Sequence, residues 1–322
     1  MSAAERESAL GAHSTTVACG FMRPSAFDAA VYIGEHTSCE TVVMTSVFDA
    51  YDELMQPSDA VTLTMSHAEQ RCFFAFVDQR SYDLLSRENR EIVRDETASA
   101  HMSPVKMVGV WRLVLLDGRM PFSSARRNSR VPKMLAHRLF PHARYALWVD
   151  SKLVLHQSAS VLRRIFLPSE GAAVFAAFRN LRRDHVDQER DWIWHHKCGE
   201  DVERCGDLIK QWTTYEAEQR SFAWAAETVA IEGSVLLQDL RSPIHNALFC
   251  NWFNEYVRFG ERDQISMAYV LHRMGLTAKG ANATPAVRFI DRSMHYLAKP
   301  SAQTLRIVRK VGHRSGSRKV LP

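Results

Sequence analysis

The sequence predicts a mixed α/β fold with a mainly parallel central sheet, and three observations carry this prediction. From Glu40 onward, short apolar runs alternate with stretches of helical periodicity. The apolar runs are rich in β-branched and aromatic residues and are too short to be core helices. The chain has 322 residues, 46% hydrophobic and 24% charged, which is an ordinary globular composition. We therefore expect helices to flank one sheet in a single Rossmann-type domain.

The predicted elements follow one another along the chain in a regular order. The expected strands cover residues 41–48, 72–77, 110–116, 145–149, 173–178 and 234–237. The expected helices cover residues 82–93, 132–140, 160–166, 201–220 and 264–274. Pro132 suits the first turn of its helix, and Pro141 marks the end of the same helix after Phe140.

The two ends of the chain differ in composition from its body. Residues 1–40 are mixed and rich in turn formers, which predicts an irregular N-terminal extension before a domain over residues 41–291. Residues 292–322 read as a basic, flexible tail. No run approaches the roughly 18 apolar residues of a membrane span, and charges interrupt the first residues where a signal peptide needs an apolar core. These features predict a soluble, cytoplasmic protein.

Charge and cysteine content narrow the classes of partner. Eight of the 41 basic residues lie in the tail, which has no acid, so the body carries 33 basic against 36 acidic residues. The body is therefore not a nucleic-acid-binding surface by charge, whereas the tail is suited to peripheral contact with an anionic membrane. Six cysteines in a chain of this length do not predict a disulfide scaffold, and we expect Cys72 and Cys250 to be small buried hydrophobes.

Three predicted strands end directly in an acid, at Asp78, Asp117 and Asp150. In open α/β sheets, ligands bind outside the carboxyl ends of the strands, so these acids are candidates for a functional site. The alternative is that each aspartate only caps the helix or turn that follows it.

A strongly basic segment, residues 126–152, contains a predicted helix and the strand that ends at Asp150. Lys133 and His137 are four residues apart and share one face of the predicted helix. A cationic helix face beside a strand-end acid suits a diphosphate, with or without a bridging metal ion. The alternative is a solvated basic helix followed by a capping aspartate.

At these residues the chain resembles a glycosyltransferase-like domain family whose plant members include a hexosyltransferase of seed mucilage and a turgor-regulation protein. The matching segments are CGF (19–21), VVMTSVFDAYDEL (42–54), CFFAFVD (72–78), GVWRLVLL (109–116), RRNSRVPKMLAHRLFPHARYALWVDSKL (126–153), EGSVLL (232–237) and NALFCNWFNEYVRFGERDQISMAYV (246–270). They occur in the same order as in the family and cover most of residues 19–270. The long motifs are too specific to arise by chance.

The resemblance implies a fold of the GT-A type and transfer of a hexose-type sugar from a nucleotide-diphospho-sugar donor to a glycan or lipid-linked acceptor. Many GT-A enzymes hold Mn²⁺ or Mg²⁺ against the donor diphosphate with an Asp-x-Asp motif. This chain has Asp150-Ser151-Lys152, so a cation replaces the second acid. Two alternatives are open: Asp150 still holds a divalent metal with help from His295, or Lys152 neutralises the diphosphate directly.

The resemblance also implies roles for individual residues. The expected donor contacts are Thr45, Ser46, Asp49, Tyr51, Asp78, Arg127, Arg130, Lys133, Asp150, Lys152 and Gln264. Asp263 is expected near the sugar and acceptor, and Glu255 and Asp263 are the two candidates for a catalytic base, although Asp263 also suits a helix N-cap.

Two other functions remain as alternatives, a ceramidase-like hydrolase and a non-catalytic protein that binds nucleotides or carbohydrates. The chain has no GxGxxG, P-loop or GxSxG motif, which argues against dinucleotide, kinase and ordinary α/β-hydrolase chemistry.

Overall fold

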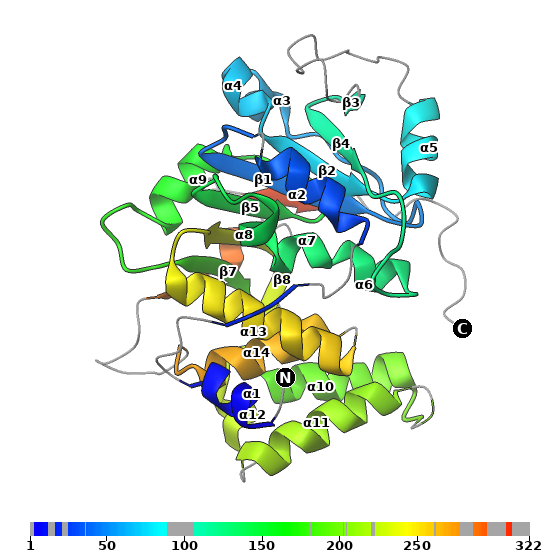
Figure 1. Ribbon diagram of the computed structural model, residues 1–322. Helices are drawn as coiled ribbons and strands as arrows, with labels where there is room; N and C mark the ends of the chain where they lie inside the picture. Colours follow the sequence, from blue (N-terminus) through cyan, green and yellow to red (C-terminus); the bar gives the residue numbers. More distant parts are fainter. Residues whose placement is uncertain are drawn as a thin grey trace. The chain divides into compact units, whose positions relative to one another are not determined.

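The predicted sheet is confirmed by the computed structural model, which describes residues 3–11, 17–20, 25–35, 37–88, 106–180, 182–201, 203, 205–219, 223–260, 262–276, 286–294 and 307–310. Eight strands form one sheet in the order β3 (Lys106–Val108), β4 (Trp111–Leu115), β2 (Phe73–Val77), β1 (Thr41–Val47), β5 (Tyr145–Val149), β8 (Ile231–Asp239), β7 (Phe175–Arg179) and β9 (Val287–Ile290) (Figure 1). β1 runs parallel to β2 and β5, β2 to β4, and β7 to β9. β3 and β8 run antiparallel to their neighbours β4 and β5. The sheet is thus mainly parallel and the fold class is mixed α/β.

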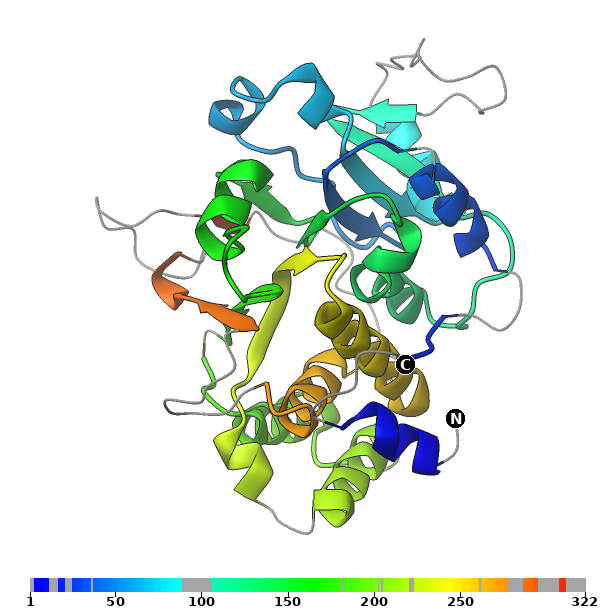
Figure 2. The same cartoon turned by 60° about the vertical axis from the view of Figure 1, so that its left-hand side comes forward.

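The chain divides into two compact units. The first unit contains residues 1–20, 166–233 and 241–292, and the second contains residues 21–165, 234–240 and 293–322. The helices of the first unit are α1 (Ala3–Ala9), α10 (Val186–Ile193), the π-helix η1 (Trp194–Cys198), α11 (Gly206–Gln219), α12 (Ala223–Glu227), α13 (Pro243–Phe259) and α14 (Asp263–Arg273). Figures 1 and 2 both show α13 beside α14 in this unit.

The second unit carries the strands whose carboxyl ends the sequence singles out. Its helices are α2 (Phe27–Glu35), α3 (Asp59–Thr62), α4 (His67–Gln70), α5 (Gln79–Glu88), α6 (Ala125–Ser129), α7 (Val131–Met134), α8 (Ala136–Leu139) and α9 (Ala159–Phe166), with a 3-10 turn η2 (Arg292–Met294). All five residues of β2 and all five of β5 are buried, as expected for parallel strands covered on both faces. Val47 of β1 pairs with Val77 of β2, so these two strands end side by side. Acids that follow the strands therefore gather at one edge.

The predicted helix over residues 132–140 is present but is broken in two. Pro132 occupies the first turn of α7, as the sequence predicts. The chain leaves helical geometry at Leu135, where φ is −110° and ψ is 25°, and α8 begins at the next residue. The break seats α8 against α2, where a Cβ on Gly34 would lie 1.5 Å from the Leu139 carbonyl oxygen. Only glycine allows so close an approach.

The expectation of an irregular N-terminal extension is wrong, because α1 and α2 lie within residues 1–40. Each helix hides part of its surface: Arg6 of α1 is 8% exposed, and Phe27 of α2 is 1% exposed. These short helices are held by tertiary contacts, and local propensity alone gave little sign of them.

The flexible tail predicted for residues 292–322 is also wrong in part. A short strand, β10 (Val308–Lys310), pairs antiparallel with β6 (Leu153–Leu155), and Ile307 and Val308 are fully buried. The N–H of His156 donates to the Ile307 carbonyl at 2.8 Å. Residues 295–306 and 311–322 lie outside the described residues.

The expectation that the cysteines form no disulfide scaffold, with Cys72 and Cys250 as free hydrophobes, is wrong as well. The disulfides are Cys19–Cys250, Cys39–Cys72 and Cys198–Cys205. Cys39 precedes β1 and Cys72 precedes β2, so parallel pairing of the two strands brings the Cα atoms to 5.8 Å, within the range of a disulfide. Sequence spacing does not reveal such pairs.

None of the described helices has the length and the uninterrupted apolar character needed to cross a bilayer.

Candidate active site

Asp78, which follows β2, holds the loop that leaves β1. Its Oδ2 accepts the backbone N–H of Asp49 at 2.8 Å, and its Oδ1 accepts the N–H of Ser81 at 2.9 Å. The buried Ser81 hydroxyl accepts the N–H of Ala50 at 2.9 Å. Asp49 and Ala50 have φ values of 55° and 51°, which are unfavourable for residues other than glycine, and these bonds stabilise the turn. Asp78 thus caps the start of α5, the alternative named for the strand-end acids, and also shapes the loop, whereas its contact with the donor stays a prediction.

The side chains of this loop are open to solvent. Asp49 is exposed and forms a close ion pair with Arg80. Tyr51 is 50% exposed, so it is not packed into the core as an isolated loop tyrosine commonly is. Its predicted stacking on a nucleotide base stays a prediction.

Thr45 and Ser46 differ in accessibility although they are neighbours on β1. Thr45 is fully buried, and among the described residues its hydroxyl has no hydrogen-bond partner. A donor contact at Thr45 would require the sheet to open, which weighs against that prediction. Ser46 is half-buried, and its hydroxyl donates to the Ser129 carbonyl at 2.7 Å. This bond ties the end of the basic helix α6 to the carboxyl end of β1.

The basic segment lies against β1 through α7. The Arg127 guanidinium stacks 4.2 Å from the centre of the Phe122 ring, and Arg130 is half-buried at the junction of α6 and α7. Lys133 is only 4% exposed, and its carbonyl accepts the Gln238 side-chain amide at 3.1 Å. The alternative of a solvated helix face is therefore wrong for Lys133, which is a core position, whereas its contact with the donor stays a prediction.

The strand-end acid Asp150 is held on both of its oxygens. The Trp148 indole N–H donates to Oδ1 at 3.1 Å, and the Lys152 ammonium donates to Oδ2 at 3.0 Å. A third group joins them, because Lys152 Nζ lies 3.8 Å from Asp52 Oδ2. The side chains of Asp52, Asp150 and Lys152 are 18%, 26% and 21% exposed.

The sequence predicts no individual role for Asp52. It belongs to the loop after β1 and is a hundred residues away from Lys152 along the chain. The loop is tied to the turn after β5 because the Met55 N–H donates to the Ser151 carbonyl at 2.8 Å. The VFDAYDEL motif contains this acid, but only the pairing of β1 with β5 shows what it faces.

Asp263 and Gln264 begin α14 in the first unit, but Asp263 is not the N-cap. The N-cap is Arg262, and the buried Asp263 lies in the first turn, where an acid is favourable to the helix dipole. The Asp263 carbonyl accepts the Trp252 indole N–H at 2.7 Å. The Gln264 amide donates to the Ile231 carbonyl at 3.0 Å, which is a structural use of a residue predicted to contact donor.

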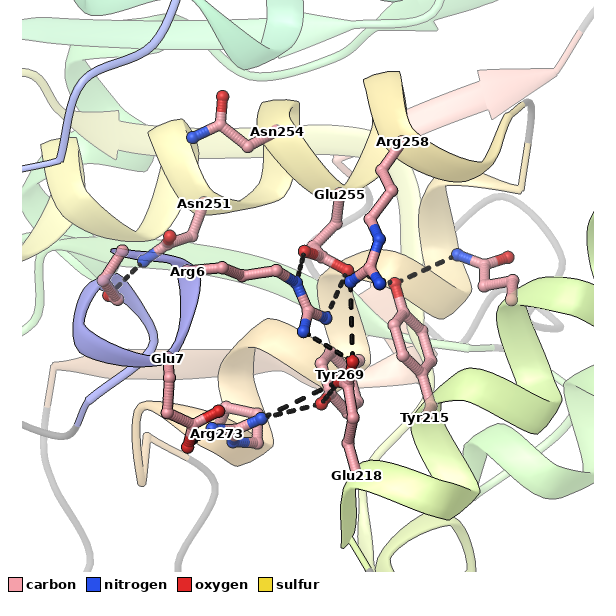
Figure 3. A network of polar contacts seen from close by, with 12 residues as sticks. Arg6, Glu7, Tyr215, Glu218, Asn251, Asn254, Glu255, Arg258, Tyr269 and Arg273 are labelled. Carbon is pink, nitrogen blue, oxygen red and sulfur yellow. Dashed lines mark hydrogen bonds and ion pairs between the residues drawn. The ribbon is translucent and has the colours of Figure 1, made fainter. Parts of the chain in front are cut away.

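Glu255 is the centre of a buried ion network in the first unit (Figure 3). The Arg6 guanidinium donates to both Glu255 oxygens at 2.5 and 2.9 Å, and the Tyr215 hydroxyl donates to Oε2 at 3.0 Å. Arg6 also donates to Glu218 at 2.7 Å, and Tyr269 donates to Glu218 at 2.5 Å. Glu255 is 1% exposed, so this geometry favours a structural role over the predicted role of base.

The pKa shifts agree with a network held in its charged form. Burial and the negative charge of Glu255 raise the pKa of Tyr215 well above its usual value. Burial would lower the pKa of Arg6, but its bonds to Glu255 outweigh burial and raise that pKa. Burial acts to raise the pKa of Glu218, whereas bonds from Tyr269 and Arg6 lower it overall.

The structure thus gathers Asp52, Asp150 and Lys152 at the carboxyl edge of the second unit, with Asp49, Asp78 and Ser46 on the loop and strand beside them. Asp263, Gln264 and Glu255 belong to the first unit. His295, the candidate remote metal ligand, lies outside the described residues.

Residues 1–294 match the TOD1/MUCI70 glycosyltransferase-like domain family. The chain is 34% identical over 267 residues to "Probable hexosyltransferase MUCI70" of Arabidopsis thaliana, covering 79% of this chain and 42% of that protein. It is 26% identical over 263 residues to "Alkaline ceramidase TOD1" of the same plant, covering 79% of this chain and 53% of that protein. The chain spans about half the length of the curated relatives it matches.

Solved structures with some similarity to this chain include glycosyltransferases. The apo bifunctional glycosyltransferase WbbM matches at 11% identity and a TM-score of 0.40, over 80% of this chain and 40% of that one. The galactosyltransferase LgtC with donor and acceptor sugar analogues matches at 11% identity and a TM-score of 0.37, over 88% and 84%. Likeness this distant carries no further argument, whereas the family match spans nearly the whole sequence. The chain therefore belongs to the TOD1/MUCI70 glycosyltransferase-like domain family.

Proposed function

We propose that the chain transfers a hexose-type sugar from a nucleotide-diphospho-sugar to a glycan or lipid-linked acceptor. The observation that carries the proposal is the cluster at the carboxyl edge of the sheet, where Lys152 lies between the acids that follow β1 and β5. This edge is where open α/β sheets bind their ligands. Family membership and a relative named as a hexosyltransferase support sugar transfer as the chemistry.

The reaction requires the bond between the anomeric carbon and the diphosphate oxygen to break. The acceptor oxygen forms the new bond to that carbon and gives up its proton, and the nucleoside diphosphate leaves with the bonding electrons. Negative charge therefore grows on the diphosphate. A lysine ammonium can stabilise this charge when it turns from its carboxylate partner to a phosphate oxygen of the donor. We assign this role to Lys152, whose ammonium donates to Asp150.

A divalent metal, which would supply the same charge stabilisation, does not fit the residues around Asp150. Both Asp150 oxygens already accept hydrogen bonds, one of them from an ammonium group. That ammonium would repel a metal ion bound to the same carboxylate. We therefore assign the stabilisation of the diphosphate to Lys152 and not to a metal ion.

The proposal is tested by incubating the purified chain with a panel of UDP-, GDP- and ADP-sugars and measuring nucleotide release and binding. We expect release with at least one donor, and Lys152→Ala should weaken nucleoside diphosphate binding about ten- to a hundredfold, or about 1.5–3 kcal/mol. Lys210→Ala, which removes an exposed lysine from α11, is the control and should bind normally. Absence of binding and release with every donor would contradict the proposal.

The ceramidase-like alternative is not favoured, because the ceramidase relative is the more distant of the two. The alternative of a non-catalytic binding protein predicts nucleotide binding without turnover in the same assay.

We further propose that this domain works in an oxidising compartment, in place of the cytoplasm that the sequence suggested. Three disulfides support this, because cytosolic thiols are normally kept reduced. Contact of the basic tail with an anionic membrane stays a prediction.

A further inference from the structure

The cluster of Asp52, Asp150 and Lys152, here named the acid–lysine–acid cluster, joins two segments that are remote in sequence. Asp52 comes from the loop after β1, and the other two residues come from the turn after β5. Lys152 Nζ lies 3.0 Å from Asp150 Oδ2 and 3.8 Å from Asp52 Oδ2. No more than 26% of any of the three side chains is exposed, so solvent screens their charges only in part.

Oxygen ligands from two aspartates are what Mg²⁺ and Mn²⁺ prefer, but here the cation between the two carboxylates is an ammonium. A divalent ion placed between the same oxygens would have to displace the lysine or share the carboxylates with it, and both arrangements are unfavourable.

We infer that Lys152 is the built-in cation of this site, that it occupies a latent two-carboxylate site for a divalent metal, and that Asp52 is the second acid of that site. Asp52 is therefore a positioning residue, which acts through Lys152. The inference deepens the proposed function, since it makes donor binding independent of metal, but its test needs no nucleotide.

The test measures Mn²⁺ binding to the full chain by electron paramagnetic resonance. The wild type should bind Mn²⁺ weakly. Lys152→Met keeps the apolar stem and removes the charge, so the two freed carboxylates should bind Mn²⁺ at least tenfold more tightly. Adding Asp52→Asn to Lys152→Met should return the affinity to that of the wild type.

Two matched variants separate this result from a general change in structure. Lys152→Arg keeps a cation between the acids and should gain no Mn²⁺ affinity, and Lys210→Met should behave as the wild type. Mn²⁺ binding by the wild type as tight as that of Lys152→Met would overturn the inference. A folded Lys152→Met protein that gains nothing would overturn it too, and if that variant does not fold, the wild-type affinity alone decides.

Failure of this inference and failure of the proposed function are distinguishable. A chain that shows the expected Mn²⁺ pattern but neither binds nor releases nucleotides keeps the inference and loses the proposed function. If the wild-type chain transfers sugar and also binds Mn²⁺ tightly, the proposed function stands and the inference fails.

Discussion

At the scale of single residues, burial decides between a chemical and a structural role for Glu255. Its sequence neighbourhood suggests a base, but its side chain is enclosed by Arg6 and Tyr215. Arg6 is almost as deeply buried and depends on Glu255 and Glu218 for its charge partners. A buried charge is costly once its partner is lost. Removal of either Arg6 or Glu255 is therefore expected to destabilise the first unit.

Glu255→Gln should therefore lower the free energy of unfolding by about 3 kcal/mol, since within the described part of the chain Glu218 is then the one carboxylate left to pair with Arg6. The control is Glu7→Gln, on the helix α1 that also carries Arg6. The Glu7 side chain is 67% exposed, so its ion pair with Arg273 contributes about 1 kcal/mol or less. Urea unfolding measures both variants. Equal stability of the two, with turnover lost only in Glu255→Gln, would restore Glu255 as a base.

His137 gives the second unit a predicted pH dependence. Burial lowers the pKa of His137 to about 4, and the nearby charge of Arg138 adds to this effect. The unfolded chain takes up this proton near pH 6.5, so the free energy of unfolding falls as the pH drops from about 6.5 to 4, by about 1–3 kcal/mol. His137→Gln, which does not titrate, should lose this part of the pH dependence.

The control for that experiment is His142→Gln, at an exposed position three residues past the end of α8. This variant should lose stability below pH 6.5 as the wild type does. The free energy of unfolding is measured by urea unfolding at several pH values. If His137→Gln shows the same loss as the wild type, the depressed pKa contributes nothing and other groups control acid unfolding.

The candidate site could be predicted only in part at this scale. Asp78 and Asp150 are visible because each directly follows an apolar strand, and both lie at the expected edge. Asp52 has no such signal, since its partner is a hundred residues away and is reached through strand pairing. Thr45 and Lys133 are polar residues that lie in the core. Their neighbours along the chain give no sign of this burial.

At the scale of elements, prediction succeeds where local pattern and tertiary packing agree. β5 has its predicted bounds because five apolar residues are flanked by polar ones on both sides. Helix α13 was not predicted, because its buried residues are distributed around much of the helix and leave no clear amphipathic stripe. β6, β9 and β10 are three or four residues long, too short for a periodic signal.

The strand β10 leads to a prediction about the tail. Ending the chain at Pro300 removes the fully buried Ile307 and Val308 together with the pairing to β6. Each buried aliphatic side chain contributes about 1.5–3 kcal/mol, so Tm should fall by several degrees. Ending the chain at Lys310 keeps the strand and should leave Tm unchanged. Equal Tm values for the two truncations would show that β10 does not stabilise the fold.

At the scale of the whole molecule, the three disulfides close loops of very different length. Cys19 and Cys250 are 231 residues apart, Cys39 and Cys72 are 33 apart, and Cys198 and Cys205 are 7 apart. A cross-link limits the unfolded chain more when it closes a longer loop, so the first two should stabilise the fold more than the third. Typical contributions are about 2–4 kcal/mol each, comparable with a large part of a domain's net stability.

The last prediction follows from this arrangement. Denatured but unreduced protein should take up no iodoacetamide, and reduction should open six sites, counted by mass spectrometry. Reduction should also lower Tm, and Cys39→Ser with Cys72→Ser should lower it more than Cys198→Ser with Cys205→Ser, because the closed loop is longer. Six adducts without reduction would mean that the chain works with free thiols. That result would return the cytoplasm as the expected compartment and remove the reason for placing the proposed sugar transfer outside it.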